Sequence, residues 1–284
     1  MGRIPILMYH SVSTVREGML APYTLSPKTF EAHLAHLVGN GYRTYTVPRL
    51  LEALAAGALH ERSVAVTFDD GLADFHQHAL PMLVRYGVAS TLYVPTADIG
   101  GTVGWLRKHP ADRRQMLTSE QLRDVHAHGV ECGAHSHTHP QLDLLRADAV
   151  TAEMRRSREV LEDLLGTRVD SFAYPFGYHR RATRNAVRAA GFRSACAVGH
   201  LVADESLDRF AVPRLIVSDT TSVAELQLLL QQRTPSPADR ALVRAKDLTW
   251  RSTRRFLRRT SGTNRCEAAR LTHYLTPSDM SPIT

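Results

Sequence analysis

The sequence predicts an α/β protein with a largely parallel sheet, and three observations support this fold class. Short apolar segments typical of strands alternate with amphipathic helical segments along most of the chain. Chemically reactive side chains follow predicted strands at three places, as is typical of parallel α/β folds and of barrels in particular. The composition, 43% hydrophobic and 22% charged over 284 residues, is that of a globular protein large enough to bury a core.

In the first part of the chain, hydrophobic runs are separated by clear turn signals. A helical face formed by Phe30, Leu34 and Leu37 is ended by the turn at 39–41, and a later helix is ended by Gly87. The run Ser-Val-Ala-Val-Thr-Phe at 63–68 is typical of a buried strand. In order, this pattern predicts a strand over 4–9, a helix over 29–37, a strand over 44–47, a helix over 48–56, a strand over 63–68 and a helix over 75–86.

The alternation continues after residue 88. Thr118 or Ser119 can cap one helix and Gly166 ends another, whereas residues 98–117 show little periodicity and predict a loop over the carboxyl ends of the strands. The predicted strands are 89–94, 130–134, 171–174, 194–198 and 212–217, and the predicted helices are 119–127, 147–165 and 181–190.

The net charge of +7 arises in the last fifth of the chain. Residues 1–232 hold 24 basic and 24 acidic side chains, whereas residues 233–284 hold 11 and 4. With Pro235-Ser236-Pro237 between them, we expect an α/β domain over 1–232 and a basic, partly helical extension over 233–284. Three widely spaced cysteines fit no disulfide framework, and no apolar run is long enough to span a membrane. The first residues do not resemble a secretory signal, so we expect a cytoplasmic location.

Two adjacent carboxylates, Asp69 and Asp70, follow the strand predicted over 63–68. A divalent cation would offset their repulsion, with one carboxylate as its ligand and the other as an ionised general base. The alternative is that an aspartate caps the helix that follows.

Three histidines within five residues, His135, His137 and His139, follow the strand predicted over 130–134. His135 and His139 are spaced so that a turn can bring both imidazoles to one cation, although the spacing alone does not exclude His137. Two imidazoles and a carboxylate suit zinc, cobalt or nickel. A surface histidine tract is the alternative.

These residues carry a resemblance to a known family. Thr67-Phe68-Asp69-Asp70-Gly71, His135-Ser136-His137-Thr138-His139 and Phe172-Ala173-Tyr174-Pro175-Phe176-Gly177 resemble, in order and spacing, three motifs of the polysaccharide deacetylases, also called the NodB-homology domain or carbohydrate esterase family 4. The resemblance spans roughly residues 4–220. It implies a distorted (β/α) barrel, usually of seven strands, and hydrolysis of acetyl groups from N-acetylhexosamines.

The resemblance also implies site residues. It assigns Asp69 as the general base and Asp70, His135 and His139 as ligands of a divalent metal, most often Zn²⁺, with Co²⁺ or Ni²⁺ as alternatives. The backbone N–H of Phe176 would stabilise the oxyanion. We expect Pro175 to fix that loop, and Tyr174, Pro175 and Trp105 to contact substrate.

The chain departs from the family pattern at two positions. Where the third motif usually begins with an arginine that orients the catalytic aspartate, this chain has Ala173, and Arg214 is the candidate replacement unless it is an ordinary surface arginine. The late Leu-x-His motif is not recognisable. His10, in Met8-Tyr9-His10-Ser11-Val12, resembles the opening of the subgroup that acts on exopolysaccharides. We expect His10 to be a general acid or substrate ligand, the alternative being a core histidine.

Residues 238–260 can form a basic amphipathic helix with Val243, Trp250 and Leu257 on one stripe. The helix could pack on the barrel or lie on an anionic membrane, so a peripheral position at the inner membrane face is one expectation, whereas nucleic acid is a less favoured partner.

The sequence therefore predicts a metal-dependent N-deacetylase that acts on an N-acetylated amino sugar in a glycan precursor, glycolipid or sugar-containing metabolite. The alternatives are a hydrolase of another non-peptide amide or an ester, and a non-catalytic glycan-binding barrel.

Overall fold

The computed structural model describes residues 4–106, 112–199, 201–204, 207–232 and 236–261. Part of the predicted loop, residues 107–111, and the end of the predicted extension, residues 262–284, lie outside this range. The chain divides into two compact units, residues 1–234 and 235–284.

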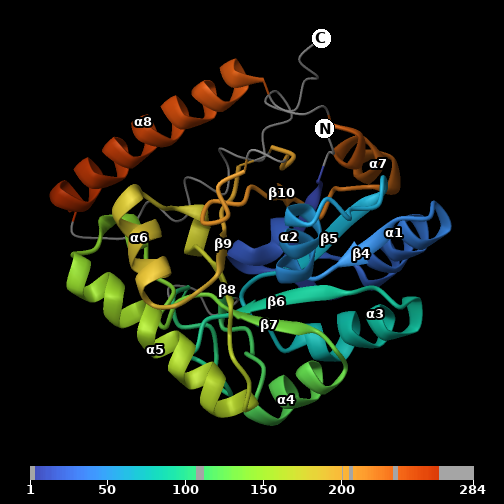
Figure 1. Ribbon diagram of the computed structural model, residues 1–284. Helices are drawn as coiled ribbons and strands as arrows, with labels where there is room; N and C mark the ends of the chain where they lie inside the picture. Colours follow the sequence, from blue (N-terminus) through green and yellow to red (C-terminus); the bar gives the residue numbers. More distant parts are fainter. Residues whose placement is uncertain (1–3, 107–111, 200, 205–206, 233–235, 262–284) are drawn as a thin grey trace. The chain divides into compact units, whose positions relative to one another are not determined.

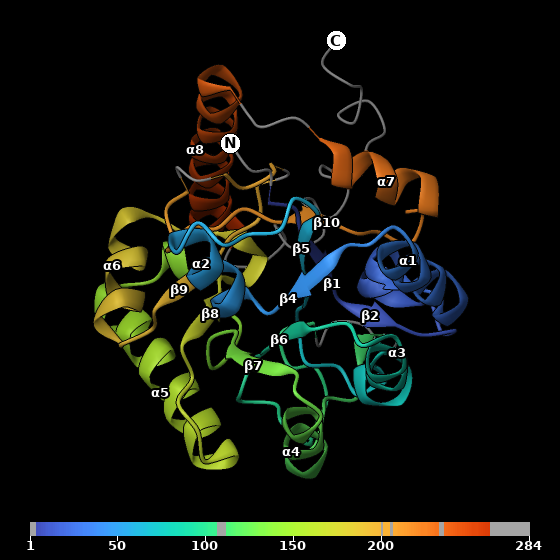
Figure 2. The same ribbon diagram turned by 45° about the vertical axis from the view of Figure 1, so that its right-hand side comes forward.

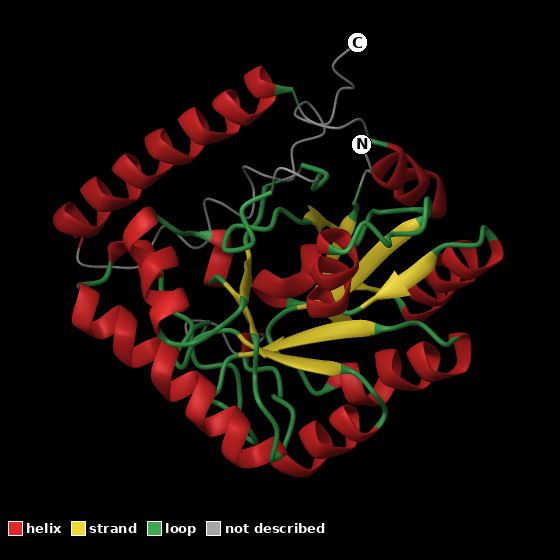
Figure 3. Cartoon of the chain, viewed as in Figure 1, coloured by secondary structure: helices red, strands yellow, loops and turns green. Residues whose placement is uncertain are grey.

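The first unit is built on a parallel sheet (Figures 1 and 3). Seven strands form a continuous path in the order β10, β1, β5, β6, β7, β8 and β9, and β4 pairs with the first half of β5. The strands of this sheet are β1 (Ile6–Tyr9), β4 (Arg43–Tyr45), β5 (Ser63–Phe68), β6 (Ser90–Val94), β7 (Glu131–Ala134), β8 (Ser171–Ala173), β9 (Ser194–Cys196) and β10 (Leu215–Ile216).

The two ends of the strand path are joined by the segment that leads into β10. The Val212 N–H donates to the Ala195 carbonyl at 2.9 Å, and the Ala197 N–H donates to the Val212 carbonyl at 2.8 Å. The sheet therefore curls into a barrel, as Figure 2 shows, and the predicted distorted barrel with seven strands is confirmed. The strand predicted over 212–217 is confined to β10 because its first residues make this connection with β9.

All helices of the first unit except α2 surround the outer face of the sheet. The helices of the first unit are α1 (Pro27–Gly39), α2 (Val47–Ala55), α3 (Leu80–Tyr86), α4 (Ser119–Ala127), α5 (Ala147–Leu165), α6 (Arg181–Ala189) and α7 (Val223–Gln231). Shorter elements are the 3₁₀ segments η1 (Gly18–Tyr23), η4 (Leu142–Leu144) and η5 (Pro175–Gly177), the π turn η2 (Phe75–Ala79), and a small pair of strands, β2 (Ser11–Val12) and β3 (Thr24–Leu25).

The alternation of side chains along each strand separates two cores. In β5, Val64, Val66 and Phe68 pack outward with the surrounding helices, whereas Ala65 belongs to an inner cluster. The inner cluster also contains Tyr93. The buried apolar face of α2 packs into this cluster, which explains the position of α2 inside the curled sheet in Figure 1. A side chain at the carboxyl end of a strand therefore points into the barrel when it continues the inward-facing alternation of that strand.

The second unit contains one described helix, α8 (Pro237–Ser261), which confirms the predicted basic helical extension. It carries eight basic and two acidic residues. Over the part of the chain that the structure covers, no helix is long and apolar enough to cross a bilayer.

Candidate metal centre and active site

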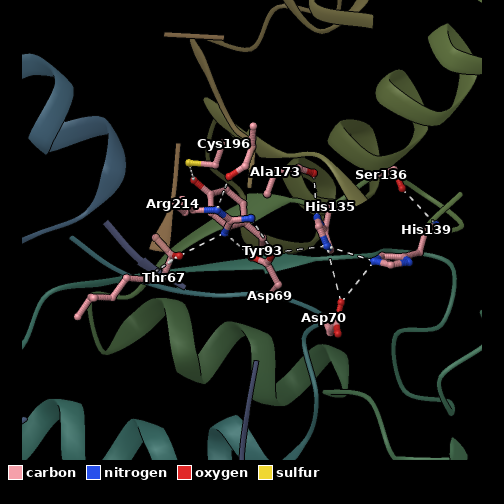
Figure 4. Close-up of polar contacts among 12 residues, drawn as sticks. Thr67, Asp69, Asp70, Tyr93, His135, Ser136, His139, Ala173, Cys196 and Arg214 are labelled. Carbon is pink, nitrogen blue, oxygen red and sulfur yellow. Dashed lines mark hydrogen bonds and ion pairs between the residues drawn. The ribbon is translucent and has the colours of Figure 1, made fainter. Parts of the chain in front are cut away.

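Four of the predicted site residues come from separate segments and meet inside the barrel. Asp69 directly follows β5, on the same alternation as the inner-facing Ala65, and His135 directly follows β7, where Cys132 and Ala134 face outward. His10 follows β1, and Arg214 precedes β10. Figure 4 shows Asp69, His135 and Arg214 converging from these strands. The strand period thus places reactive side chains far apart in sequence on one inner surface.

A compact group of potential metal ligands is formed by Asp70, His135 and His139, all of them buried. The Nε2 atoms of His135 and His139 are 3.2 Å apart. The Asp70 Oδ1 atom lies 3.7 Å from the Nε2 atom of His135 and 3.4 Å from the Nε2 atom of His139. His137 does not join them, because its Nδ1 atom lies 2.8 Å from the Thr96 hydroxyl.

This donor set fits a divalent cation. Ligands about 2.0–2.1 Å from a tetrahedral zinc ion are about 3.3 Å from one another, close to the separations of the three atoms. The Nδ1–H of His135 donates to the Ala173 carbonyl at 2.8 Å, which leaves Nε2 as the atom with a free lone pair. Burial lowers the pKa of His135 to about 4 and that of His139 to about 3, so both imidazoles are neutral near pH 7, as metal ligation requires.

The two adjacent aspartates have different counter-charges. Burial alone would raise the pKa of Asp69, but the charge and hydrogen bonds of Arg214 lower it to about 2. Arg214 binds both carboxylate oxygens, from Nη1 to Oδ1 at 2.6 Å and from Nη2 to Oδ2 at 2.7 Å. Burial raises the pKa of Asp70, whose carboxylate lies within 4 Å of the neutral imidazoles of His135 and His139 and, among the described residues, not beside a guanidinium. Asp70 is the carboxylate that a cation would stabilise.

Arg214 is completely buried, so it is not an ordinary surface arginine. Its Nη1 also donates to the Thr67 hydroxyl, and its Nε donates to the Ala197 carbonyl, both at 3.2 Å. Its guanidinium lies over the Tyr93 ring, 5.4 Å from the ring centroid. Arg214 thus makes a contact with Asp69 that the Ala173 side chain cannot make, and Figure 4 shows it beside Asp69.

Strained backbone is concentrated at this site. In the described residues, the non-glycine positions with positive φ are Asp70, Ser136, His139 and Phe176, with φ values of 75°, 64°, 57° and 58°. Such a conformation costs about 1–3 kcal/mol per residue and persists only where the surroundings enforce it. The capping alternative for the Asp-Asp pair does not account for this geometry, since the N-cap position of the helical segment that follows is Asp74, which makes no side-chain capping hydrogen bond.

His10 lies near the two aspartates. Burial lowers its pKa, and Asp70 and Asp69 partly oppose this effect. Its ring lies 4.7 Å from the Tyr23 ring, and its buried Nδ1 atom has no hydrogen-bond partner in the described part of the chain. A core histidine usually has its nitrogens satisfied, so this open nitrogen favours a role at the site.

Some of the residues expected to contact substrate lie beside the metal ligands, and one does not. Trp105 stacks on His139 with ring centroids 4.3 Å apart, so the loop after Asp98 reaches the metal ligands. Phe176 packs edge-on against His139 at 4.7 Å, and its loop begins at the buried Pro175. The expectation for Tyr174 does not fit the structure. Tyr174 is fully buried in the outer core, and its hydroxyl donates to the Phe210 carbonyl at 2.9 Å.

Sequence reasoning missed the residues that support these groups. Thr67 and Tyr93, which contact Arg214, and Tyr23, which contacts His10, were not identified as site residues. The inner phase of Thr67, two residues before Asp69, was a usable signal for that residue. For Tyr93 and Tyr23 the contact depends on how strands and loops meet in space, which the sequence pattern does not encode.

Comparison with protein families and sequences gives consistent matches. A family model described as polysaccharide deacetylase matches residues 56–195. The Bacillus subtilis protein YxkH, whose name places it among the polysaccharide deacetylases, is 30% identical over 217 residues, which is 76% of this chain and 72% of that protein. The poly-β-1,6-N-acetyl-D-glucosamine N-deacetylase of Staphylococcus aureus is 23% identical over 206 residues, which is 69% of each chain.

Solved structures show the same fold. The deacetylase PplD of Streptococcus pyogenes, solved in complex with acetate, superposes with a TM-score of 0.70 at 24% identity, over 81% of this chain and 99% of that one. IcaB of Ammonifex degensii superposes with a TM-score of 0.67 at 25% identity, over 82% and 98%.

Proposed function

Because this chain belongs to the polysaccharide deacetylase family and is a hydrolase of non-peptide amide C–N bonds, we propose that it removes the acetyl group from an N-acetylated amino sugar with the help of a divalent metal ion. The sugar would belong to a glycan precursor, a glycolipid or a sugar-containing metabolite. The name of the S. aureus relative, an N-deacetylase of poly-β-1,6-N-acetyl-D-glucosamine, supports an N-acetylglucosamine unit as the first substrate to test.

One observation carries the proposal. The Asp70, His135 and His139 ligand atoms lie beside an aspartate, Asp69, that Arg214 keeps ionised. The Asp69 Oδ2 atom is 3.8 Å from the His135 Nε2 atom, so a proton acceptor and a metal position are adjacent. This pairing is what hydrolysis by an activated water requires.

The chain's own residues then have distinct roles. When bound by Asp70, His135 and His139, the cation would supply Lewis-acid polarisation of the acetamide carbonyl. Asp69 accepts the proton of the attacking water, and Arg214 holds its carboxylate toward the reacting atoms. The Phe176 N–H donates to the developing oxyanion, and His10 binds or protonates the leaving amine. Zinc is the proposed metal, with cobalt or nickel as substitutes, since two imidazoles and one carboxylate suit all three.

Acetate release from β-1,6-linked N-acetylglucosamine oligomers by the zinc-loaded protein tests this function. We expect release by the wild type and loss of release, with zinc retained, in Asp69→Asn. An O-acetylated sugar in parallel distinguishes ester from amide hydrolysis. A protein that binds the oligomers without releasing acetate, and with the same affinity in Asp69→Asn, would be a glycan-binding barrel instead.

A specific observation supports a second activity, binding of the extension to an anionic membrane surface. Leu242, Leu248 and Phe256 of α8 are 53%, 54% and 65% exposed, and at 100° per residue they lie within an arc of about 120°. Of the eight basic residues on the same helix, Arg254 is buried, whereas exposed ones such as Lys246 and Arg255 complement anionic headgroups. Val243 and Trp250 of the predicted stripe are less exposed, and the Leu257 side chain lies outside the described residues.

Co-sedimentation with phosphatidylcholine vesicles, with and without phosphatidylglycerol, tests this binding. We expect the full-length protein to bind the anionic vesicles and a Leu242→Ser, Phe256→Ser double variant to lose that binding. Leu228→Ser is the matched control, because Leu228 is 66% exposed on α7. Equal binding by all three proteins would refute the proposal.

A further inference from the structure

The loop between His135 and His139 depends on contacts outside the metal cluster. His135 is fixed at the end of β7, where its N–H donates to the Val94 carbonyl and its Nδ1–H donates to the Ala173 carbonyl. His139 lies four residues farther on, and Ser136 and His139 both have positive φ. The position of His139 is therefore set by the loop rather than by the sheet.

Glu153 of α5 binds this loop with both carboxylate oxygens. Its Oε2 atom accepts the backbone N–H groups of His137 and Thr138, each at 2.8 Å, and its Oε1 atom accepts the Thr138 hydroxyl at 2.7 Å. Consecutive N–H groups that point to one side form a concave anion-binding arrangement. Bonds from such groups to a carboxylate are stronger than neutral hydrogen bonds.

The opposite side of the loop is held by the segment after β6. The Ala97 N–H donates to the His137 carbonyl at 2.9 Å, and the Thr96 hydroxyl lies 2.8 Å from the His137 Nδ1 atom. These contacts hold His137, whereas those of Glu153 also reach Thr138, the residue directly before His139. Within the loop, the Ser136 hydroxyl accepts the His139 N–H at 3.1 Å. Glu153 thus acts at the point where the strained chain turns toward the ligand position.

We propose that Glu153 is a positioning residue that sets the affinity of the site for its metal by fixing His139 in its ligating position. This inference rests on the proposed metal-dependent function. It assigns Glu153 no contact with substrate. Loss of a residue that orients a metal ligand typically weakens binding about 10- to 100-fold.

The test measures the affinity of metal-free protein for Zn²⁺ by competition with a chelating dye, at a temperature well below unfolding. We expect Glu153→Ala to weaken binding about 10- to 100-fold. Glu153→Gln should lose less, because the amide oxygen can still accept the two N–H groups and the amide nitrogen can donate to Thr138. The absorption spectrum of the Co²⁺-loaded protein should change in Glu153→Ala, since it reports the ligand geometry.

Glu162 provides a matched control on the same helix. Its Oε1 atom accepts the Val169 N–H at 3.0 Å and the Arg158 Nε–H at 2.8 Å, so it is also a carboxylate that anchors backbone, but away from the loop. Glu162→Gln should lower the melting temperature and leave Zn²⁺ affinity unchanged. If Glu153→Ala does not fold, Thr138→Val removes one of the three contacts and should weaken Zn²⁺ binding by a smaller factor.

The outcomes separate this inference from the proposed function. Unchanged Zn²⁺ affinity in Glu153→Ala, in a wild type that binds zinc and releases acetate, would overturn the role of Glu153 alone. An equal loss of affinity in Glu162→Gln would show a general effect of stability and also overturn it. A wild type that binds no metal would overturn both.

Discussion

Asp69 and Arg214 form a buried, bidentate ion pair at the centre of the site. Removing two charges from water is costly, and such a pair persists where its geometry is favourable and the remaining donors are satisfied. Thr67 and Ala197 accept two further hydrogen bonds from the guanidinium. The pair therefore determines both the position and the ionisation of the proposed base.

Replacing Arg214 with methionine should change the pH dependence of activity. Burial would then raise the pKa of Asp69 without opposition, so the acid limb of the kcat/KM profile should move to higher pH. Loss of one partner of a buried pair should also lower the free energy of unfolding by about 3–5 kcal/mol. Arg214→Lys keeps the charge and should show a smaller shift. An unmoved acid limb in Arg214→Met would contradict the assigned role.

Tyr174 gives a contrasting prediction, for stability rather than activity. Its buried hydroxyl donates to the Phe210 carbonyl, so Tyr174→Phe should lower the free energy of unfolding by about 1–3 kcal/mol and leave KM unchanged. Urea unfolding and steady-state kinetics on the same preparation measure both. A raised KM with unchanged stability would return Tyr174 to the substrate-contacting residues.

At the scale of elements, the strand period explains both the successes and the error of the sequence analysis. Asp69 follows the inner-facing Ala65 and Thr67, whereas Tyr174 shares the outer phase of Phe172. The main strands and the helices at 119–127 and 147–165 were predictable because their hydrophobic periods are regular. The two-residue strands β2 and β3 were not, because they form only where distant segments meet.

Helix α7 was missed although its sequence carries a start signal. Ser222 and Glu225 form a reciprocal capping box, in which each side chain accepts the other's backbone N–H. Ser222→Ala should lower the free energy of unfolding by about 0.5–2 kcal/mol, measured by urea unfolding. Glu225→Gln keeps the reciprocal hydrogen bond and should change stability less. An Ala variant as stable as the wild type would mean that the packing of Leu226, Leu229 and Leu230 holds α7 without its cap.

At the scale of the whole molecule, a buried carboxyl makes stability depend on pH. Burial raises the pKa of Glu131 to about 7 from 4.5, although hydrogen bonds from Ser171 and Thr91 oppose this. Between these two values the folded chain holds a proton that the unfolded chain releases. The contribution of Glu131 to stability is therefore present below pH 4.5 and is lost as pH rises through 7.

Glu131→Gln should remove this dependence. Relative to the wild type, the variant should gain stability as pH rises from about 5 to 8, by at most about 3 kcal/mol, since its side chain stays neutral. Urea unfolding of metal-free protein at several pH values measures the difference. A constant difference between the two proteins across this range would contradict the assigned pKa.

The measurement that tests the account most directly is the metal content of the purified protein beside that of His135→Ala. Asp70, His135 and His139 are within reach of one ion and buried together, so we predict about one zinc, cobalt or nickel ion per chain in the wild type, and a sharp fall in the variant. The variant should still fold, as its far-ultraviolet circular dichroism would report. A wild type that stays metal-free after reconstitution, or a variant that retains its ion, would contradict the proposed metal centre.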